Sequence, residues 1–220
     1  MKIAILNDTH CGIRNSSQIF LDNAKDFYDN VFFPECEKHN IKQVVHLGDY
    51  YDHRKFVNFK ALNHNRKCFL NELRKRGMMM DIIPGNHDTY YKNTNDLNAL
   101  KELLGHYMNE IHIIMEPTVM EYGSLKMGLL PWINSENYEQ SMNFIRDCKA
   151  DWLGAHLELY GFDMLKGIPN KHGMDPKLVS RFEQVISGHF HTASQKENIW
   201  YLGSQMEFFW SDAHDPKYFH

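Results

Sequence analysis

Short apolar runs recur along the chain, and five of them end at an aspartate, an asparagine or a histidine. Runs of this kind, closed by glycine or proline, are typical of buried β-strands. The polar stretches are Asp8-Thr9-His10, Gly48-Asp49, Gly85-Asn86-His87-Asp88, Gly154-Ala155-His156 and Gly188-His189-Phe190-His191. Strands are expected over residues 2–7, 42–47, 78–83, 111–115, 119–122, 125–130, 152–155, 185–187 and 200–203, and from residue 218.

Apolar residues at helical spacing separate the strands of the first half. Helices are expected after Ser16-Ser17, an N-cap pair, and over residues 58–76, 95–107 and 135–148, with a long loop over 161–176. Gly77 occupies the C′ position of the second helix, and Leu97 is expected to face inward on the third. Alternating strands and helices, followed by hairpins, predict a two-layered α/β sandwich that forms one domain over residues 1–220.

Composition narrows the class of protein. The chain of 220 residues has a net charge of −4, which argues against a broadly basic nucleic-acid binder but allows a nuclease whose metals supply local positive charge. Four widely spaced cysteines without a C-x-x-C pair argue against a disulfide framework or a zinc ribbon. No apolar run approaches the ~20 residues that cross a bilayer. A reducing cytoplasm is the expected location.

The polar side chains at the strand ends are candidate metal ligands, because ligand sites of open α/β sheets lie at the carboxyl ends of the strands. All offer nitrogen or oxygen, which favours Mn²⁺, Fe²⁺ or Zn²⁺ over Cu⁺, and the many imidazoles argue against Mg²⁺ or Ca²⁺. The set exceeds the needs of one tetrahedral zinc but suits two ions that share a carboxylate. Its members are Asp8, His10, Asp49, Asn86, His156, His189 and His191.

A shared carboxylate would divide these ligands into two sets. If Asp49 bridges, one ion can be held by Asp8, His10 and His191, and the other by Asn86, His156 and His189. Two divalent ions would lower the pKa of a water molecule toward neutrality and stabilise charge on a phosphoryl group. His87 can protonate the leaving oxygen, and Asp52 can accept a hydrogen bond from His87 and orient it.

Together the stretches match five motifs in order, D-x-H, G-D-x-x-D, G-N-H-[DE], G-x-H and G-H-x-H, from residue 8 to residue 191. In this combination the chain resembles the calcineurin-like metallophosphoesterases. The resemblance implies their fold, a two-layered β-sandwich flanked by helices in four α-β-β-α layers. It also implies metal-binding roles for the candidate ligands and a catalytic role for His87.

Within that superfamily the chain is similar to the nuclease subunits of recombination-repair ATPase–nuclease complexes, the SbcD type, and most to those of T-even phages. Supporting stretches are Tyr91-Lys92-Asn93, Leu130-Pro131-Trp132 and Tyr201-Leu202-Gly203-Ser204. The resemblance implies Mn²⁺-dependent 3′–5′ exonuclease and single-strand endonuclease activity on DNA, with Fe²⁺, Zn²⁺ or Mg²⁺ as alternative ions. It further implies a homodimer, an SMC-like ABC ATPase partner, a role in double-strand-break repair and recombination, and a bacterial or phage-infected host cytoplasm.

Full-length relatives continue into a DNA-capping domain and an ATPase-binding segment, which we expect to be absent from residues 1–220.

Several loop cations can contact DNA phosphates, or can equally be solvated charge; they are Arg14, Arg54, Lys55 and Lys92. Aromatic residues that can stack on an unpaired base are Tyr50, Tyr51 and Phe190. His53 and His172 are close enough in sequence to the site loops to contact substrate, although solvated loop histidines are commoner. A dimer face on the second helix can include Phe56, Phe59, Leu62 and Phe69, of which half are expected to pack on the chain's own sheet.

Two other functions stay open on the residues alone. A phosphatase or small-molecule phosphodiesterase would use the same centre, although the chain lacks the G-D-x-V-D-R-G and G-N-H-E wording of protein phosphatases. A metal-stabilised scaffold that docks an ATPase and binds DNA without cutting would keep the same fold. An intact ligand set disfavours the scaffold.

Overall fold

Two β-sheets form the centre of the protein, and the computed structural model describes residues 1–212, 217, 219 and 220. The strands are β1 (Ile3–Leu6), β2 (Gln43–His46), β3 (Met79–Ile82), β4 (Ile111–Ile113), β5 (Thr118–Tyr122), β6 (Leu125–Leu130), β7 (Trp152–His156), β8 (Asp163–Leu165), β9 (Ile168–Pro169), β10 (Gln184–Gly188), β11 (Ser194–Lys196) and β12 (Ile199–Tyr201). The first sheet is parallel, in the order β1-β2-β3-β4. The second is mixed, in the order β11-β12-β10-β7-β6-β5.

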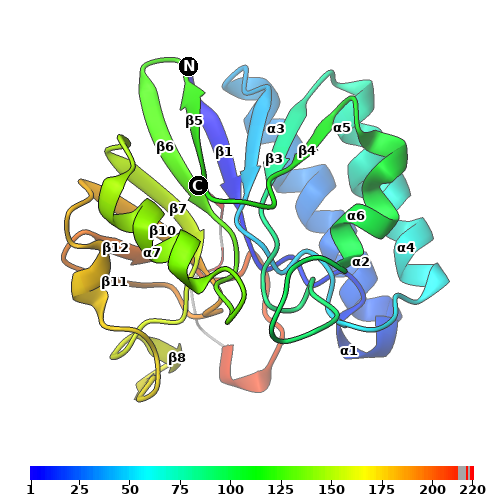
Figure 1. Cartoon of the computed structure of the whole chain (residues 1–220). Helices are drawn as coiled ribbons and strands as arrows, with labels where there is room; N and C mark the ends of the chain where they lie inside the picture. The colour runs from blue at the N-terminus through cyan, green and yellow to red at the C-terminus, as the bar shows by residue number, and fades with distance from the viewer. Residues whose placement is uncertain (213–216, 218) are drawn as a thin grey trace.

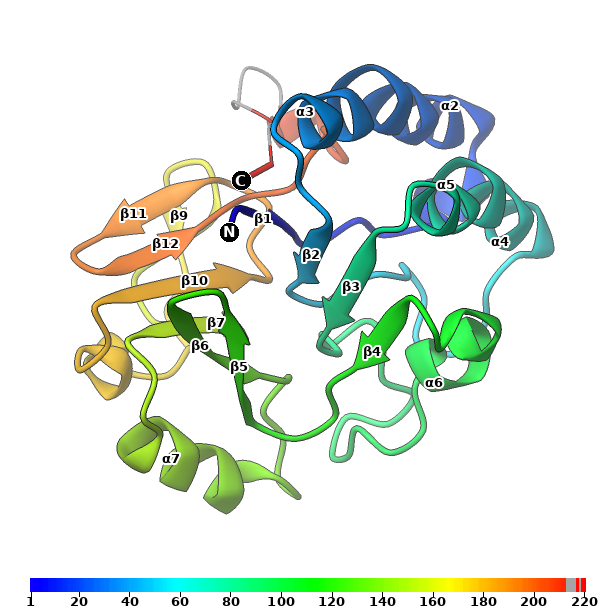
Figure 2. The same cartoon turned by 90° about the horizontal axis from the view of Figure 1, so that it is seen from above.

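Helices cover the outer faces of both sheets, as Figure 2 shows. They are α1 (Ile13–Ser16), α2 (Gln18–Phe27), α3 (Phe33–Lys38), α4 (Phe59–Asn65), α5 (Asn71–Lys75), α6 (Ala99–Leu104) and α7 (Tyr138–Asp147), with π-helical turns η1 (Tyr28–Phe32) and η2 (Arg66–Leu70) and 3-10 turns η3 (Gly105–Tyr107), η4 (Pro176–Val179) and η5 (Trp210–Asp212). Val45 and Ile186 belong to an apolar cluster that both sheets share. Phe69 and Ile145 belong to the clusters under the two helical layers. The predicted β-sandwich flanked by helices is confirmed.

Several boundaries differ from the prediction because side chains compete for backbone groups. The helix expected from residue 95 begins at Ala99, since the Asn98 side chain accepts from Lys101 N–H and caps it, and Leu97 is 39% exposed rather than inward. The helix expected from residue 135 begins at Tyr138. Residues 161–176 contain the β8–β9 hairpin rather than only loop.

Some terminal features also differ. Ser17 occupies the N-cap position of α2 without a side-chain capping bond. The strand expected from residue 218 includes a residue outside those described, while the backbone of His220 pairs with Ile5 of β1. Among the described residues, no helix is long and apolar enough to cross a membrane.

The parallel strands deliver the candidate ligands to one region of the molecule. In Figure 1 the arrow of β1 points down toward the loops that carry them. Backbone pairing continues beyond the strands and fixes these loops, since Asp8 N–H donates to Gly48 O (2.9 Å) and His10 N–H donates to Asp49 O (3.0 Å). The loops after β1 and β2 therefore leave the first sheet side by side.

Candidate metal centre

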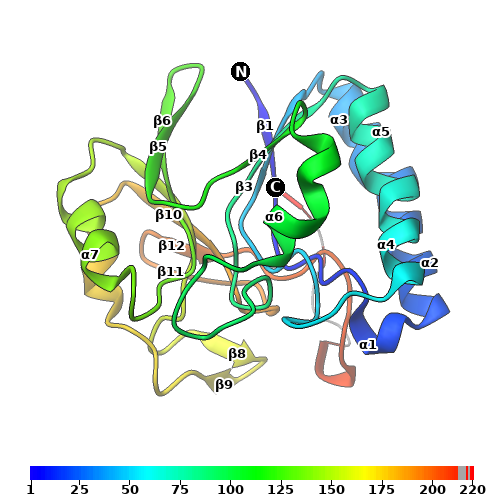
Figure 3. The same ribbon diagram turned by 45° about the vertical axis from the view of Figure 1, so that its right-hand side comes forward.

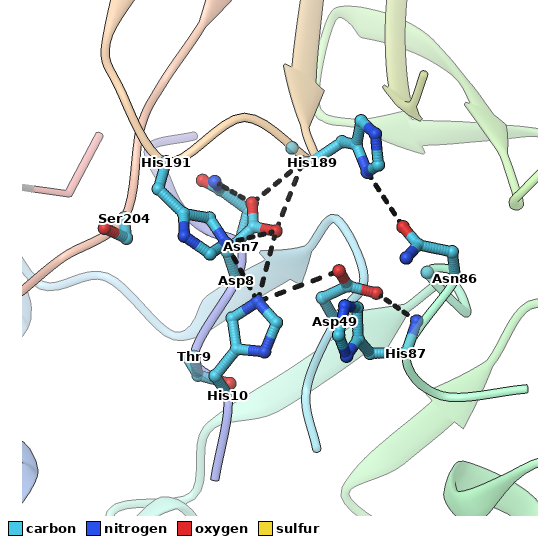
Figure 4. A network of polar contacts seen from close by, with 12 residues as sticks. Asn7, Asp8, Thr9, His10, Asp49, Asn86, His87, His189, His191 and Ser204 are labelled. Carbon is cyan, nitrogen blue, oxygen red and sulfur yellow. Dashed lines mark hydrogen bonds and ion pairs between the residues drawn. The ribbon is translucent and has the colours of Figure 1, made fainter. Parts of the chain in front are cut away.

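The candidate ligands leave their strands through sharp backbone turns. Four of them have positive φ angles, namely Asp8 (48°), His10 (41°), Asp49 (53°) and His189 (91°). Residues other than glycine rarely adopt this region, and such strain concentrates at functional sites. The turns bring side chains from both sheets to one point, as Figure 4 shows.

One group of ligand atoms combines Asp8, His10 and His191. The Nε2 atoms of His10 and His191 lie 3.0 Å apart. Asp8 Oδ1 lies 3.8 Å from the first and 3.9 Å from the second. Because Asp8 and His10 follow β1 and His191 follows β10, both sheets contribute to this group.

A second group combines Asn86, His156 and His189. Asn86 Oδ1 lies 2.8 Å from His189 Nδ1 and 3.0 Å from His156 Nε2. The structure therefore brings all the candidate ligands together in the two sets that the sequence predicted. Their binding of metal stays a prediction.

Asp49 lies between the two groups. Its Oδ2 is 3.7 Å from His10 Nε2 and 3.4 Å from His156 Nε2. Its Oδ1 accepts the backbone N–H of His87 at 2.7 Å, which fixes the orientation of the carboxylate. One oxygen thus faces both sets of ligands, which is the geometry that a bridging carboxylate needs.

Ligands bound about 2.1 Å from one ion lie roughly 3.0 to 3.4 Å from their neighbours. The pairs His10–His191, Asn86–His156 and Asp49–His156 lie within this range. Asp8, at 3.8 and 3.9 Å from the two histidines of its group, needs a shift of a few tenths of an ångström to share an ion with them. His156 Nδ1 donates to Leu47 O at 2.7 Å, so the lone pair of Nε2 faces the oxygens of Asn86 and Asp49. Converging acceptors repel one another unless a proton or a cation lies between them. The residues present therefore fit a pair of divalent ions.

Burial and mutual charge set the pKa values in this centre. Burial lowers the pKa of His156, but the Asp49 carboxylate outweighs burial and raises the pKa to about 9. Burial raises the pKa of the Asp49 carboxyl, but the charge of His156 outweighs burial and keeps this pKa well below its usual range. Burial lowers the pKa of His189 to about 3. His189 is therefore neutral and can donate its lone pair to a metal, whereas His156 has to release a proton first.

Asn7 supports the centre and was not predicted. Its buried Nδ2 donates to Asp8 Oδ2 (2.6 Å) and to the carbonyl of Gly203 (2.8 Å). These bonds fix the Asp8 carboxylate and attach the loop after β12 to it. A polar residue at the end of an apolar strand, directly before the D-x-H stretch, was the available signal.

Asp88 is a second residue that supports the centre. Its carboxylate accepts backbone N–H bonds from Gly85 (2.9 Å), Tyr50 (3.0 Å) and Tyr51 (3.1 Å). Burial raises the pKa of Asp88 to about 7. The last residue of the G-N-H-D stretch therefore ties its own loop to the loop that follows Asp49.

Glycine is required where these two loops cross. A Cβ at Gly85 would lie 2.3 Å from Asp49 Oδ1 and 2.4 Å from Asp49 N, and a Cβ at Gly48 would lie 2.6 Å from Gly85 N. Gly48 also has a φ of 89°. The glycines of the G-D and G-N-H motifs thus let the backbones that carry Asp49 and Asn86 approach each other.

His87 lies beside the centre, and Asp52 accepts a hydrogen bond from it through the backbone carbonyl. His87 Nδ1 lies 2.6 Å from the backbone carbonyl oxygen of Asp52 and donates to it. The Asp52 carboxylate lies 3.2 Å from His10 Nδ1 instead. Asp52 thus accepts the predicted hydrogen bond from His87, but through its main chain, because its carboxylate turns toward a candidate ligand.

The predicted stacking residues are in the core. Tyr50 and Tyr51 have no exposed surface, and Tyr50 donates its hydroxyl to Asn65 Oδ1 (2.8 Å). Phe190 is 4% exposed and packs on Tyr201, with ring centres 4.7 Å apart. The prediction that these three rings stack on a base is wrong, because apolar packing under the loops already buries them.

The predicted cations lie in different surroundings. Arg54 and Lys55 line a cavity of about 310 Å³ together with His87 and His53. Arg14 lies on the opposite side, where its guanidinium covers the ring of Phe209. Lys92 lies in an exposed loop. His172 lines a separate cavity of about 560 Å³ that also reaches His156.

The chain is similar to known proteins. The family described as Calcineurin-like phosphoesterase matches residues 1–193. Exonuclease subunit 1 of Enterobacteria phage T4 is 31% identical over 223 residues, which covers 100% of this chain and 63% of the phage protein. The chain thus spans less than two thirds of that relative. The crystal structure of the Pseudomonas putida nuclease MPE aligns with 87% of this chain and 62% of its own, with a TM-score of 0.40 and 18% identity.

The family match includes every motif from residue 8 to residue 191, and members of such a family use divalent metals. The ligand groups described above lie within the matched residues. The chain belongs to the calcineurin-like phosphoesterase family.

Proposed function

We propose that this protein is a metal-dependent DNA nuclease that hydrolyses phosphodiester bonds with two divalent ions, Mn²⁺ foremost. The observation that carries the proposal is the Oδ2 atom of Asp49, which faces one ligand group at 3.7 Å and the other at 3.4 Å. Two ions held there would lower the pKa of a water molecule and stabilise charge on the phosphoryl oxygens. The hydrogen bond from His87 Nδ1 to the carbonyl of Asp52 orients the ring, so that Nε2 can deliver a proton to the leaving oxygen when both ring nitrogens are protonated.

DNA as the substrate is supported by cations on both sides of the centre. Arg54 and Lys55 share a cavity with His87, and Arg14 lies over the ring of Phe209, which stacks on His191. A strand that crosses the centre would meet positive charge before and after the scissile phosphate. The T4 relative is an exonuclease subunit by name. We therefore propose 3′–5′ exonuclease and single-strand endonuclease activity, in repair and recombination.

The similarity to the phage subunit also suggests binding partners. The relative is a subunit, which supports a complex, and we propose an ABC ATPase as the partner and the cytoplasm as the location. A homodimer is supported by an apolar groove of about 200 Å³ on α4 and α6. Phe59 (85%), Phe56 (63%) and Leu97 (39%) are exposed there.

One assay tests the nuclease against the two other candidate functions. Wild type and His87→Ala are incubated with Mn²⁺ and end-labelled DNA, beside a chromogenic phosphomonoester. Single-nucleotide products that fall by about a hundredfold or more in the variant support the nuclease. Monoester turnover with intact DNA would establish a phosphatase, and inertness toward both substrates would leave a scaffold. Elemental analysis of both proteins checks that the variant keeps its metals.

A further inference from the structure

Exposed aromatic side chains lie next to one end of the metal centre. We name Phe209 and Trp210 the aromatic shelf. Trp210 is 95% exposed and Phe209 is 43% exposed. Tryptophan is usually well buried, and where it is kept in water it commonly serves a contact with another molecule.

The shelf is attached directly to candidate ligands. The neighbouring Phe208 is buried, and its ring centre lies 5.4 Å from that of His10 and 5.1 Å from that of His191. The ring of Phe209 stacks on His191, with centres 6.1 Å apart and an interplanar angle of 17°. A molecule bound on the shelf would therefore lie about one side chain away from the ligand group of Asp8, His10 and His191.

The shelf is held in place before anything binds. The Asp212 carboxylate, 1% exposed, accepts the backbone N–H of Phe208 (2.8 Å) and of Phe209 (3.1 Å). From α1, Arg14 Nε donates to the carbonyl of Phe208 (3.1 Å), and its guanidinium lies 4.6 Å from the centre of the Phe209 ring. Figure 3 shows the red segment of η5 beside α1. A site fixed in this way loses little entropy when a ligand binds.

A cavity of about 770 Å³ opens beside the shelf, and its charges suit a nucleotide. Arg14 and Lys217 line it with positive charge for phosphates, although Lys217 Nζ also donates to His191 O (2.9 Å). Asp26 and Glu207 line it too and offer acceptors for the amino groups of bases. Flat rings with cations and carboxylates at their edges match a base and its phosphate better than they match an apolar peptide.

We propose that the aromatic shelf binds unpaired bases of the substrate strand, on the side of the scissile phosphate that faces His10 and His191. The inference rests on the proposed nuclease and adds where its substrate strand is held by unpaired bases, namely beside the ligand group of Asp8, His10 and His191. A base that is paired and stacked within a duplex has no free face for Trp210.

The test is equilibrium binding of two fluorescent 12-nucleotide strands, oligo-dT and its fully abasic analogue, followed by anisotropy with Ca²⁺ while a gel confirms intact strands. Wild type is compared with Trp210→Ala, with Trp210→Phe, and with Trp200→Ala as a matched control, because Trp200 is 37% exposed on β12. Trp210→Ala is expected to bind oligo-dT about 5- to 100-fold more weakly and to lose the preference over the abasic strand. Trp210→Phe should restore most of that preference, and Trp200→Ala should match wild type.

Unchanged binding by Trp210→Ala, or equal weakening toward both strands, would overturn the shelf as a base-binding site and leave it to a protein partner. Cleavage of oligo-dT with Mn²⁺ by wild type separates this outcome from failure of the nuclease. Base-dependent binding without cleavage removes the nuclease and keeps the shelf. Cleavage with equal binding of the two strands removes the shelf and keeps the nuclease.

Discussion

Asp52 acts through two different atoms. Its backbone carbonyl accepts from His87 Nδ1, and its carboxylate lies beside His10 Nδ1. The main chain is unaffected by substitution of the side chain. A change at Asp52 therefore separates the support of a metal ligand from the orientation of the proposed acid.

Asp52→Asn is expected to weaken one Mn²⁺ site by about tenfold, because His10 loses its carboxylate partner, and to leave the second site unchanged. Isothermal titration with Mn²⁺ measures both affinities. Asp151→Asn, a change at an exposed aspartate, serves as the control. Two sites with wild-type affinity would show that the carboxylate does not support His10.

His46 makes stability depend on pH. The side chain is fully buried, and burial lowers its pKa from 6.5 to about 3. The folded state thus favours neutral His46, so this stabilisation is complete above pH 6.5 and is lost as the pH falls toward 3, by about 1.4 kcal/mol per pH unit. Urea unfolding of EDTA-treated protein at pH 7 and pH 5 measures the loss. His46→Gln should lose about 2 kcal/mol less over this interval, and equal losses would contradict the assignment.

At this scale the sequence identified side chains but not the atoms through which they act. The candidate ligands could be predicted, since each follows an apolar run that ends abruptly. The carbonyl role of Asp52 could not, because a main-chain acceptor leaves no trace in residue type. Tyr50, Tyr51 and Phe190 look like a stacking surface in sequence, and only packing shows that they are core.

At the scale of elements, the loops after β2 and β3 depend on their close approach at Gly85. Strand ends could be predicted from apolar runs, because burial of a parallel strand dictates the run. The start of α6 could not be, since the Asn98 side chain competes with helical hydrogen bonding. The β8–β9 hairpin lies in a stretch whose glycine and lysine content predicted only loop.

Gly85→Ala is expected to destabilise the protein by more than about 3 kcal/mol, or to abolish Mn²⁺ binding, because the new Cβ would overlap Asp49. Gly105→Ala is the matched control: nothing lies within 4 Å of a Cβ there, and the change should be neutral or stabilise by up to about 1 kcal/mol. Thermal unfolding and metal titration of both variants provide the comparison. Wild-type behaviour of Gly85→Ala would show that the two loops can separate without loss of the centre.

At the scale of the whole molecule, the groove beside α4 and α6 is apolar, and several of its side chains are exposed among the residues that the structure describes. Leu62 and Phe69 are buried within the protein, while Phe56 and Phe59 are exposed. The sequence predicted that about half of the residues in the dimer face would be buried within the protein. It did not predict which residues would be buried and which exposed. That division depends on how the helix is rotated against the sheet.

Phe59→Glu is expected to shift the proposed dimer to monomer, because burying an unpaired carboxylate in an apolar contact is unfavourable. Sedimentation velocity at several concentrations measures the change. Tyr160→Glu, at a residue 56% exposed elsewhere, is the control. A wild-type protein that stays monomeric at high concentration would end the dimer proposal.

The ligand groups draw on both sheets, and His189 N–H donates to the Asp8 carboxylate across 181 positions of sequence. Ions held at that point would connect the two halves of the sandwich where the loops after β1, β2, β3 and β10 meet. Loss of the ions would then lower the free energy of unfolding as well as the activity, because the free energy of their binding also stabilises the native state. In a cell with little of the metal, the protein would unfold more often and be degraded faster by proteases. The metal concentration would then determine the lifetime of the protein as well as its rate of catalysis.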